Sequence, residues 1–216
     1  MSVEASWDAE YSSGRYLGEP PVGFVRDVID ASPRGARTLY VGCGNGRNFV
    51  PLLEAGLDVV GLDISRAAID ALKARVPDAQ LVHGDLRAAQ GEFDAVVGIQ
   101  VFQHGTRAEA HAHIAAAQQR VRPGGLFCIR VNAVGTDVWP EHDVVEDDEG
   151  LTVRYRAGAK AGLDVHFFAE QELERLFADW EPLLPLRLDV TPRTAPAPGQ
   201  WSQWEAIWRQ LSPDAA

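Results

Sequence analysis

The sequence is poor in cysteine, in basic residues and in long apolar runs, and each shortage argues against a class of protein. Its two cysteines, Cys43 and Cys128, are too few for a disulfide framework, and their strand-like surroundings suit reduced thiols in a reducing compartment. No apolar run approaches the roughly 18 residues that span a bilayer. The first residues also lack the basic and apolar regions of a signal peptide. We therefore expect a cytoplasmic protein.

The shortage of basic residues also limits the expected partners. The 216 residues include 20 Lys and Arg against 31 Asp and Glu, which gives a formal net charge of −11. Proteins that bind nucleic acids or anionic membrane surfaces rely on clustered basic residues that neutralise phosphates. We expect neither partner, and we expect most of the acidic residues to serve solubility.

The remaining composition is that of one folded domain. Apolar residues make up 46% of the chain, and a chain of this length is typical of a single domain with a sizeable core. No internal repeat or linker-like low-complexity segment divides it. We expect one domain over residues 1–216.

Short apolar segments alternate with helical patterns as far as Asn132. Strands are expected at 38–44, 58–64, 79–85, 93–102 and 126–132. Helices are expected from Pro20 to about Ser32, at 47–56, at 65–76 with Ser65 as N-cap, and at 107–121 before a break at residues 123–125. Buried strands that alternate with such helices indicate a parallel sheet covered on both faces, a doubly wound α/β fold.

Beyond Asn132 the pattern is less regular, and we interpret this part as the end of the same sheet plus an insertion. The acidic stretch 139–150, which contains His142, fits no calcium-loop spacing and is expected to be a solvated loop. Strands are expected at 151–155 and 164–168, a helix at 170–177, and extended segments around 183–190 and 201–208. The spacing of Trp201, Trp204 and Trp208 fits either a helix or a strand.

A glycine-rich turn follows the first expected strand. Gly42, Gly44 and Gly46 stand between that strand and a helix, where residues without a Cβ let the backbone approach a ligand closely. Asp63 ends the next strand, 17 residues after Gly46, and can accept both hydroxyls of a ribose. Asp85 ends the third strand and can reach the exocyclic amine of an adenine. The alternative is that the glycines only form a tight turn and the aspartates cap helices.

The details of this turn separate two classes of cofactor. A dinucleotide fingerprint needs a further glycine where this chain has Arg47. The turn and the two acids instead resemble the motifs of class I S-adenosylmethionine-dependent methyltransferases. The segments WDAEYSSGRYLGEPP, GNGRN, GLDIS, FDAVV, RPGGLF and HFFAEQEL occur in the order seen in small bacterial members similar to tellurite-resistance and thiopurine methyltransferases. The resemblance implies a Rossmann-like fold with a mostly parallel, seven-stranded sheet and helices on both faces.

The same resemblance implies a binding site for S-adenosylmethionine. It assigns Gly42, Cys43, Gly44 and Gly46 to the methionine end, Asp63 to the ribose, Ile64, Asp85 and Leu86 to the adenine, and Gln100 to the carboxypropyl arm. Trp7 and Tyr11 match a segment, here residues 1–19, that folds over the cofactor as a lid. An equally good explanation is that these two rings anchor the N-terminal segment to the sheet by hydrophobic contact. Residues 133–168 correspond to an insertion on the substrate side, where Trp139 is expected to touch the substrate.

Methyl transfer from a sulfonium needs alignment of the acceptor, and it needs a base only where the acceptor must lose a proton. His104 follows the fourth strand and is the candidate base, although it can equally pack at the start of a helix. His111 and His113 are two residues apart on a helix and do not share a face, so we expect no metal there.

The expected function is transfer of a methyl group from S-adenosylmethionine to a small-molecule acceptor, with S-adenosylhomocysteine as the product. The acceptor atom stays open between a soft inorganic or thiol nucleophile and a metabolite hydroxyl or amine. A nicotinamide-dependent oxidoreductase on the same fold and a non-catalytic cofactor-binding module are the alternatives.

Overall fold

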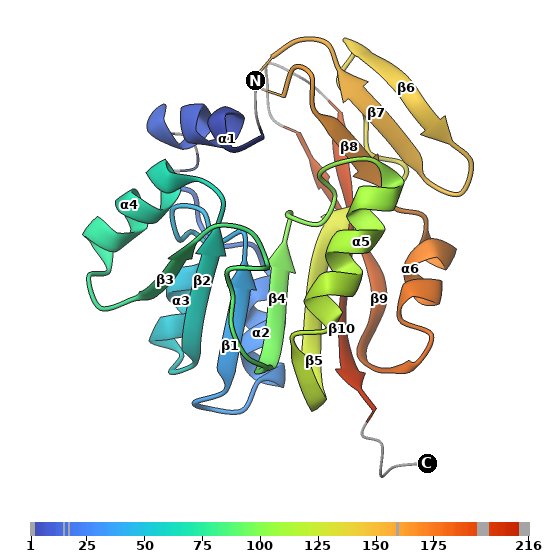
Figure 1. The fold of residues 1–216 in the computed structure, drawn as a ribbon. Coiled ribbons are helices and arrows are strands. Elements are labelled where there is room, and N and C mark those ends of the chain that lie inside the picture. Colours follow the sequence, from blue (N-terminus) through green and yellow to red (C-terminus); the bar gives the residue numbers. More distant parts are fainter. Residues whose placement is uncertain (1–2, 15, 17, 159, 194–198, 212–216) are drawn as a thin grey trace.

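A seven-stranded sheet forms the centre of the chain in the computed structural model, which describes all residues except 1–2, 15, 17, 159, 194–198 and 212–216 (Figure 1). In spatial order the strands are β3 (Gln80–His83), β2 (Asp58–Asp63), β1 (Arg37–Val41), β4 (Phe93–Ile99), β5 (Val121–Asn132), β10 (Gln200–Gln210) and β9 (Trp180–Pro192). The first five strands run parallel, and β10 is antiparallel to both of its neighbours. The predicted doubly wound, mostly parallel, seven-stranded α/β fold is confirmed.

Helices cover both faces of this sheet. They are α1 (Val3–Ser12), α2 (Phe24–Ala31), α3 (Phe49–Glu54), α4 (Arg66–Arg75), α5 (Arg107–Gln118) and α6 (Glu170–Leu176). Helices α2, α3 and α4 bury their apolar residues on one face, and α5 and α6 bury theirs on the other. Helix α1 lies beyond the carboxyl ends of the strands, beside α4 (Figure 1).

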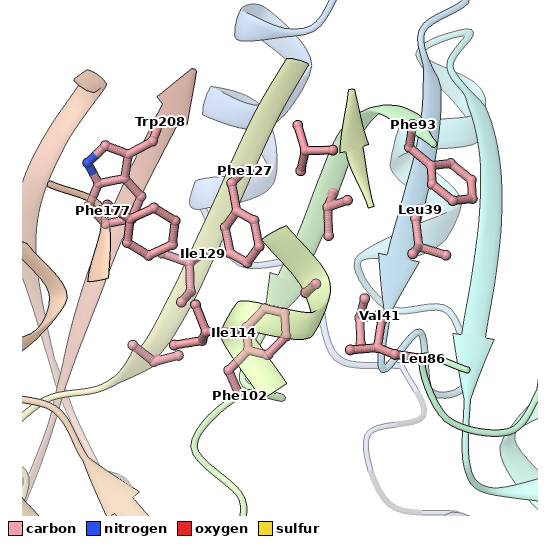
Figure 2. Packing of buried hydrophobic residues seen from close by; sticks show 14 of the residues in the cluster. Leu39, Val41, Leu86, Phe93, Phe102, Ile114, Phe127, Ile129, Phe177 and Trp208 are labelled. Carbon is pink, nitrogen blue, oxygen red and sulfur yellow. The ribbon is translucent and has the colours of Figure 1, made fainter. Parts of the chain in front are cut away.

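The core follows from the unbroken apolar runs of the strands. Leu39 on β1 and Phe127 and Ile129 on β5 are fully buried, and Ile114 of α5 packs against the same cluster (Figure 2). Each such side chain contributes roughly 1.5–3 kcal/mol when it leaves water. Because both faces of these strands are buried, the helices and the sheet hold the carboxyl-end loops on a rigid base.

Two helix starts carry the caps that their sequences favour. The Ser65 hydroxyl accepts a hydrogen bond from the Ala68 N–H, as expected for the N-cap of α4. Thr106 and Glu109 form a reciprocal capping box at α5. These caps fix the loops after β2 and β4, and both loops lead into the cavity described below.

A second, three-stranded antiparallel sheet stands above the carboxyl ends of the main sheet (Figure 1). It contains β6 (His142–Asp147), β7 (Leu151–Tyr155) and β8 (Asp164–Phe167). The expectation of a solvated loop over the acidic stretch is wrong for β6, because Val144 pairs with Val153 of β7, while the side chains of Asp143 and Asp147 are exposed. An isolated bridge joins His104 to Val165 and so ties β8 to the loop after β4.

Two further boundaries differ from the sequence-based expectation, and the open choice between helix and strand for the last three tryptophans is resolved. Helix α2 begins at Phe24 rather than Pro20. Strand β5 already begins at Val121, because Val121 pairs with Phe93 and the ladder continues past residues 123–125 after a register shift. Trp201, Trp204 and Trp208 all lie on a strand, β10, where Trp208 stacks on Phe177 in the core.

Among the described residues, no helix combines the length and the apolar character needed to cross a bilayer. Cys43 and Cys128 are buried free thiols, and burial raises the pKa of each. Both are therefore protonated at neutral pH, and a protonated thiol is a poor nucleophile.

Candidate functional site

A cavity of about 1440 Å³ opens at the carboxyl ends of β1, β2, β4 and β5. In an open α/β sheet this is the edge where ligands bind. Eleven of the sequence-predicted residues line it: Trp7, Tyr11, Gly42, Cys43, Gly44, Asp63, Ile64, Asp85, Leu86, Gln100 and His104. Gly46 does not line it, because this residue faces inward, where an added Cβ would lie 2.5 Å from Leu72.

The turn after β1 brings bare backbone to the cavity. Gly42 and Gly44 have φ angles of +70° and +52°, which side chains rarely tolerate. A Cβ on Gly42 would lie 2.7 Å from Val101, and one on Gly44 would lie 2.5 Å from the Tyr11 hydroxyl. Both the backbone conformation and the space therefore require glycine.

Asp63 is held at the end of β2 by backbone donors on either side. Its Oδ2 accepts from the Gly44 N–H at 2.7 Å and its Oδ1 accepts from the Ser65 N–H at 2.8 Å. Burial raises the pKa of this carboxyl, and these two hydrogen bonds oppose the rise. Each oxygen keeps a second lone pair, so the carboxylate can accept two ligand hydroxyls while its position stays fixed.

Helix α1 covers the glycine-rich turn. Tyr11 lies over Gly44, and the Trp7 ring meets the His104 ring edge-on with centroids 5.0 Å apart. Asp8 docks the helix, because its Oδ1 accepts from the Ser65 hydroxyl at 2.6 Å and from the Ala67 N–H at 3.1 Å. Asp8 is a residue that sequence reasoning missed. Its carboxylate stabilises the start of α4 in the way that anions favour helix N-termini.

The other predicted cofactor residues lie around the same cavity. The carboxylate of Asp85 pairs with the guanidinium of Arg87, and hydrogen bonds from Arg87 lower the pKa of Asp85. Gln100 has a φ of +58°, and its N–H donates to the Arg130 carbonyl at 2.7 Å. A left-handed conformation at a non-glycine residue is strained, and such strain clusters at functional sites.

His104 lies beneath Trp7 with its Nδ1 buried and without a hydrogen-bond partner among the described residues. Burial and, to a smaller extent, the positive charge of Lys160 lower the pKa of His104 to about 3, although a hydrogen bond with the Gln100 backbone opposes the shift. The ring is therefore neutral at physiological pH, with a free lone pair.

The opposite wall of the cavity is built from charged residues that sequence reasoning did not single out. Arg130 on β5 is only 4% exposed. Its guanidinium pairs with Glu205 at 2.9 Å and with Asp189 at 2.5 Å. Arg187 on β9 also pairs with Glu205, at 2.8 Å. No local motif marks these residues, because their partners lie on strands that are far away in the sequence.

Several polar atoms on the cavity wall are buried and have no hydrogen-bond partner among the described residues. Besides His104 Nδ1 they are Gln103 Oε1, Arg130 Nη1, Trp139 Nε1 and Arg193 Nε. A buried polar group left unpaired costs about 1–3 kcal/mol, so these atoms indicate a cavity shaped for a polar ligand. Trp139 lies on this wall, at 6.4 Å from Trp201 between ring centroids.

Known methyltransferases are similar in sequence to about half of this chain. Residues 39–125 match the family model described as "Methyltransferase domain". An uncharacterized methyltransferase of Synechocystis is 36% identical over 98 residues, which cover 44% of this chain and 46% of that protein. A ubiquinone biosynthesis O-methyltransferase of Mesorhizobium japonicum is 32% identical over 115 residues, or 49% and 45% of the two chains. The chain therefore spans about half the length of the curated relatives it matches.

Solved structures share the fold over nearly the whole chain. TehB from Haemophilus influenzae matches with a TM-score of 0.67 at 22% identity and covers 93% of this chain and 66% of its own. The 1,6-didemethyltoxoflavin-N1-methyltransferase of Burkholderia thailandensis, solved with bound 1,6-didemethyltoxoflavin and S-adenosylhomocysteine, has a TM-score of 0.66 at 21% identity. That match covers 97% of this chain and 88% of the other.

Proposed function

We propose that the chain is a class I S-adenosylmethionine-dependent methyltransferase that transfers a methyl group to a small organic acceptor; the match of residues 39–125 to a methyltransferase domain supports this. One observation supports this proposal most strongly. The Gly42–Gly44 turn, the Asp63 carboxylate that it holds, and several buried polar atoms without a hydrogen-bond partner among the described residues all line one cavity.

The residues at the first half of the cavity fit S-adenosylmethionine. We propose that Gly42, Cys43 and Gly44 receive its methionine end, that Asp63 accepts the ribose hydroxyls, and that Gln100 lies beside the amino acid arm. Ile64, Asp85 and Leu86 then take the adenine. Gly46 has no direct contact in this proposal and acts through the shape of the turn.

The size of the cavity supports a second, organic ligand beside the cofactor. Its volume of about 1440 Å³ exceeds the ~300–1,000 Å³ of a typical single-ligand pocket. The unpaired atoms of Arg130, Trp139 and Arg193 line the part that faces β9 and β10. We assign this part to the acceptor, with residues 133–168 as the insertion on the acceptor side. A polar organic molecule satisfies these atoms better than a bare inorganic ion.

The bound cofactor supplies an electrophilic methyl group on a positively charged sulfur. The chain's task is then to hold the acceptor atom about 3–3.5 Å from that methyl group and in line with it. We propose that Trp7 and Tyr11 close over the site as part of the segment 1–19 and exclude water. Their ring faces also favour a neighbouring positive charge.

His104 is the residue that we propose to contact the acceptor. Its unprotonated Nδ1 can accept a hydrogen bond from an acceptor O–H or N–H and so aim the nucleophile's lone pair. A conjugate acid with a pKa of about 3 makes His104 a weak proton acceptor at neutral pH. We therefore propose orientation as its main role, with proton removal required only for a hydroxyl acceptor.

Binding titrations test the cofactor assignment directly. Calorimetry with S-adenosylmethionine, S-adenosylhomocysteine and NADH should give binding of the first two alone. Asp63→Ala should weaken that binding at least about tenfold, since a hydrogen bond to a charged group contributes ~1.5–3 kcal/mol. Asp58→Ala, at the other end of β2, is the matched control. Binding of NADH alone would support the oxidoreductase alternative and remove the proposal.

A screen of acceptors tests the transfer itself. The curated relatives include O-methyltransferases and a sugar N,N-dimethyltransferase, so the screen should contain phenols, amino sugars and thiols. His104→Ala should lower the rate with the true acceptor while leaving cofactor affinity unchanged. Cofactor binding without transfer to any acceptor would support a non-catalytic module.

The composition supports the setting of this activity. We propose a cytoplasmic enzyme, because both thiols are free and buried and the chain has few basic residues. The net charge of −11 favours a small acceptor over nucleic acid.

A further inference from the structure

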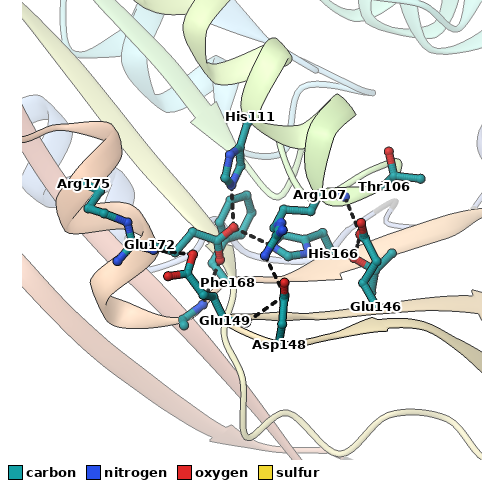
Figure 3. Close-up of polar contacts among 12 residues, drawn as sticks. Thr106, Arg107, His111, Glu146, Asp148, Glu149, His166, Phe168, Glu172 and Arg175 are labelled. Carbon is teal, nitrogen blue, oxygen red and sulfur yellow. Dashed lines mark hydrogen bonds and ion pairs between the residues drawn. The ribbon is translucent and has the colours of Figure 1, made fainter.

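Three side chains that can bind metal ions meet behind the cavity, outside the site described above. His111 comes from α5, His166 from β8 and Glu172 from α6, and their ligand atoms all lie within 4.8 Å of one another (Figure 3). His166 and Glu172 are fully buried, whereas the His111 side chain is 32% exposed. Within the described part of the chain this is the one such group.

The hydrogen bonds around His166 decide which of its nitrogens carries a proton. The Thr152 hydroxyl has one hydrogen and donates it to Glu146 Oε2 at 2.8 Å. The same hydroxyl oxygen lies 2.9 Å from His166 Nδ1, so it accepts a hydrogen bond from an Nδ1–H. A neutral His166 therefore has its lone pair on Nε2.

That lone pair faces a carboxylate oxygen. His166 Nε2 lies 2.9 Å from Glu172 Oε1, and His111 Nε2 is in contact with the same oxygen. Two facing lone pairs repel, so either a proton or a metal cation lies between Nε2 and Oε1.

We propose that His111, His166 and Glu172 form a binding site for a divalent cation of the zinc class. Two imidazoles and one carboxylate are a ligand set of zinc, with bonds of ~2.0–2.2 Å. At these lengths tetrahedral ligands stand about 3.3 Å apart. His166 Nε2 and Glu172 Oε1 are 2.9 Å apart, so a bound cation requires the ligand atoms to separate from Oε1 by rotation of the side chains. The exposed side of His111 leaves room for a water as the fourth ligand.

The surrounding contacts support a metal site built from second-layer partners. Ligating histidines usually donate their other N–H to a nearby acceptor, which fixes the ring and its tautomer. For His166 this acceptor is the Thr152 hydroxyl, which in turn donates to Glu146. Glu146 also accepts a hydrogen bond from the Arg107 N–H at 3.1 Å. The Ala169 N–H donates to Glu172 Oε2 at 3.1 Å and leaves Oε1 for the cation.

The position of the site indicates what the cation does. It joins α5 of the main domain to β8 and α6, and His166 also donates its backbone N–H to the Gln103 carbonyl at 2.8 Å. Gln103 and His104 line the cavity. A bound cation therefore fastens the small sheet to the main domain and steadies the cavity wall next to His104.

Zinc binding to the untagged full chain tests the proposal. After metal removal with a chelator, titration with Zn²⁺ alone, in competition with a chromophoric indicator, should give one equivalent bound per chain and a higher unfolding temperature. His111→Gln and Glu172→Gln should each weaken Zn²⁺ binding at least about tenfold. His142→Gln, a histidine on the same small sheet outside the cluster, should leave it unchanged.

Cobalt provides a second measurement that does not depend on stability. Co²⁺ bound to three protein ligands and a water should give visible absorption bands, and His111→Gln should abolish them. Because His111 is partly exposed, this variant decides the question if Glu172→Gln fails to fold. The absence of Zn²⁺ binding, or binding that His111→Gln leaves unchanged, overturns the proposal and leaves an imidazolium–carboxylate pair in its place.

Discussion

The two halves of the seven-stranded sheet bury different chemistry. In the half that contains β1 to β4 the buried side chains are mainly apolar, and the central acid, Asp63, bonds to backbone N–H groups. In the half that contains β5, β10 and β9 the strands bury charged and polar side chains, including Arg130, Gln203 and Glu205. One half presents backbone to a ligand, and the other presents side chains.

This difference is what we expect if one half of the sheet binds the cofactor and the other half binds the acceptor. A cofactor that is the same for every member of a fold is best held by backbone and one carboxylate, which require only a short local motif. An acceptor that differs between enzymes is read by side chains, which can change without disturbing the turn. Buried charges then need partners on neighbouring strands, which explains the Arg130–Glu205–Arg187 chain of ion pairs.

The largest effect on stability should come from removing the ion pairs in the half with β5, β10 and β9. Arg130→Met should lower the free energy of unfolding by about 3–5 kcal/mol, because it leaves the buried Glu205 and its partly exposed neighbour Asp189 with too little positive charge. Urea denaturation measures this change.

Adding Glu205→Gln should restore much of the loss, since the second substitution removes the uncompensated charge. Equal, additive losses from the two substitutions would show that the pair is not coupled.

In the half with β1 to β4, the next largest effect should come from substituting a glycine of the turn after β1. Gly42→Ala should cost about 2–3 kcal/mol, because alanine at a φ of +70° is strained and its Cβ would lie 2.7 Å from Val101. It should also reduce affinity for S-adenosylhomocysteine, measured by calorimetry.

Gly35→Ala separates the two causes. Gly35 has a φ of +76°, but an added Cβ would meet no atom within 4 Å, so this variant should show the strain alone, about 1–2 kcal/mol. Cofactor affinity should stay unchanged in this control. An equal loss of affinity in both variants would mean that the turn acts only through stability.

The same comparison explains what the sequence could predict. The strands, the glycine-rich turn and Asp63 follow from local spacing, because neighbouring parallel strands bring their ends together by topology alone. Asp85 and Leu86 reach the cavity for the same reason. The exception is Gly46, whose place inside the turn depends on contact with Leu72 of α4.

The half with β5, β10 and β9, and the small sheet above it, depend on contacts between segments that are distant in the sequence. Arg130 meets Glu205 only because β10 inserts antiparallel beside β5. His111 appears isolated on α5 until β8 and α6 bring His166 and Glu172 against it. Strand β6 was not predicted because its acidic composition gives no sign of the pairing with β7. Neither spacing nor composition carries this information.

Acid should reveal the neutral state of His104, which lies at the boundary between the halves. Its pKa falls from an ordinary 6.5 to about 3 through burial, with Lys160 and His113 contributing. Below pH 6.5 the unfolded chain binds a proton that the folded chain excludes, so stability falls as the pH falls toward 3. His104→Gln should remove about 2 kcal/mol of the stability lost between pH 7 and pH 5.

The measurement is the difference between the two urea-denaturation profiles across this pH range, because other groups titrate equally in both proteins. Parallel profiles would mean that His104 has the same pKa in the folded chain as in the unfolded chain, so that burial does not keep the ring neutral below pH 6.5.

The smallest effect should come from undocking the lid. Asp8→Ala removes the acceptor for the Ser65 hydroxyl and the Ala67 N–H, and should cost about 1 kcal/mol, as loss of a helix cap does. Asp8→Asn keeps an acceptor oxygen and should lose less. If α1 closes over the cofactor, Asp8→Ala should also weaken S-adenosylhomocysteine binding several-fold and speed proteolysis near Trp7. Unchanged affinity with faster proteolysis would make α1 a hydrophobic anchor, and the backbone half would then bind its ligand without help from the N-terminus.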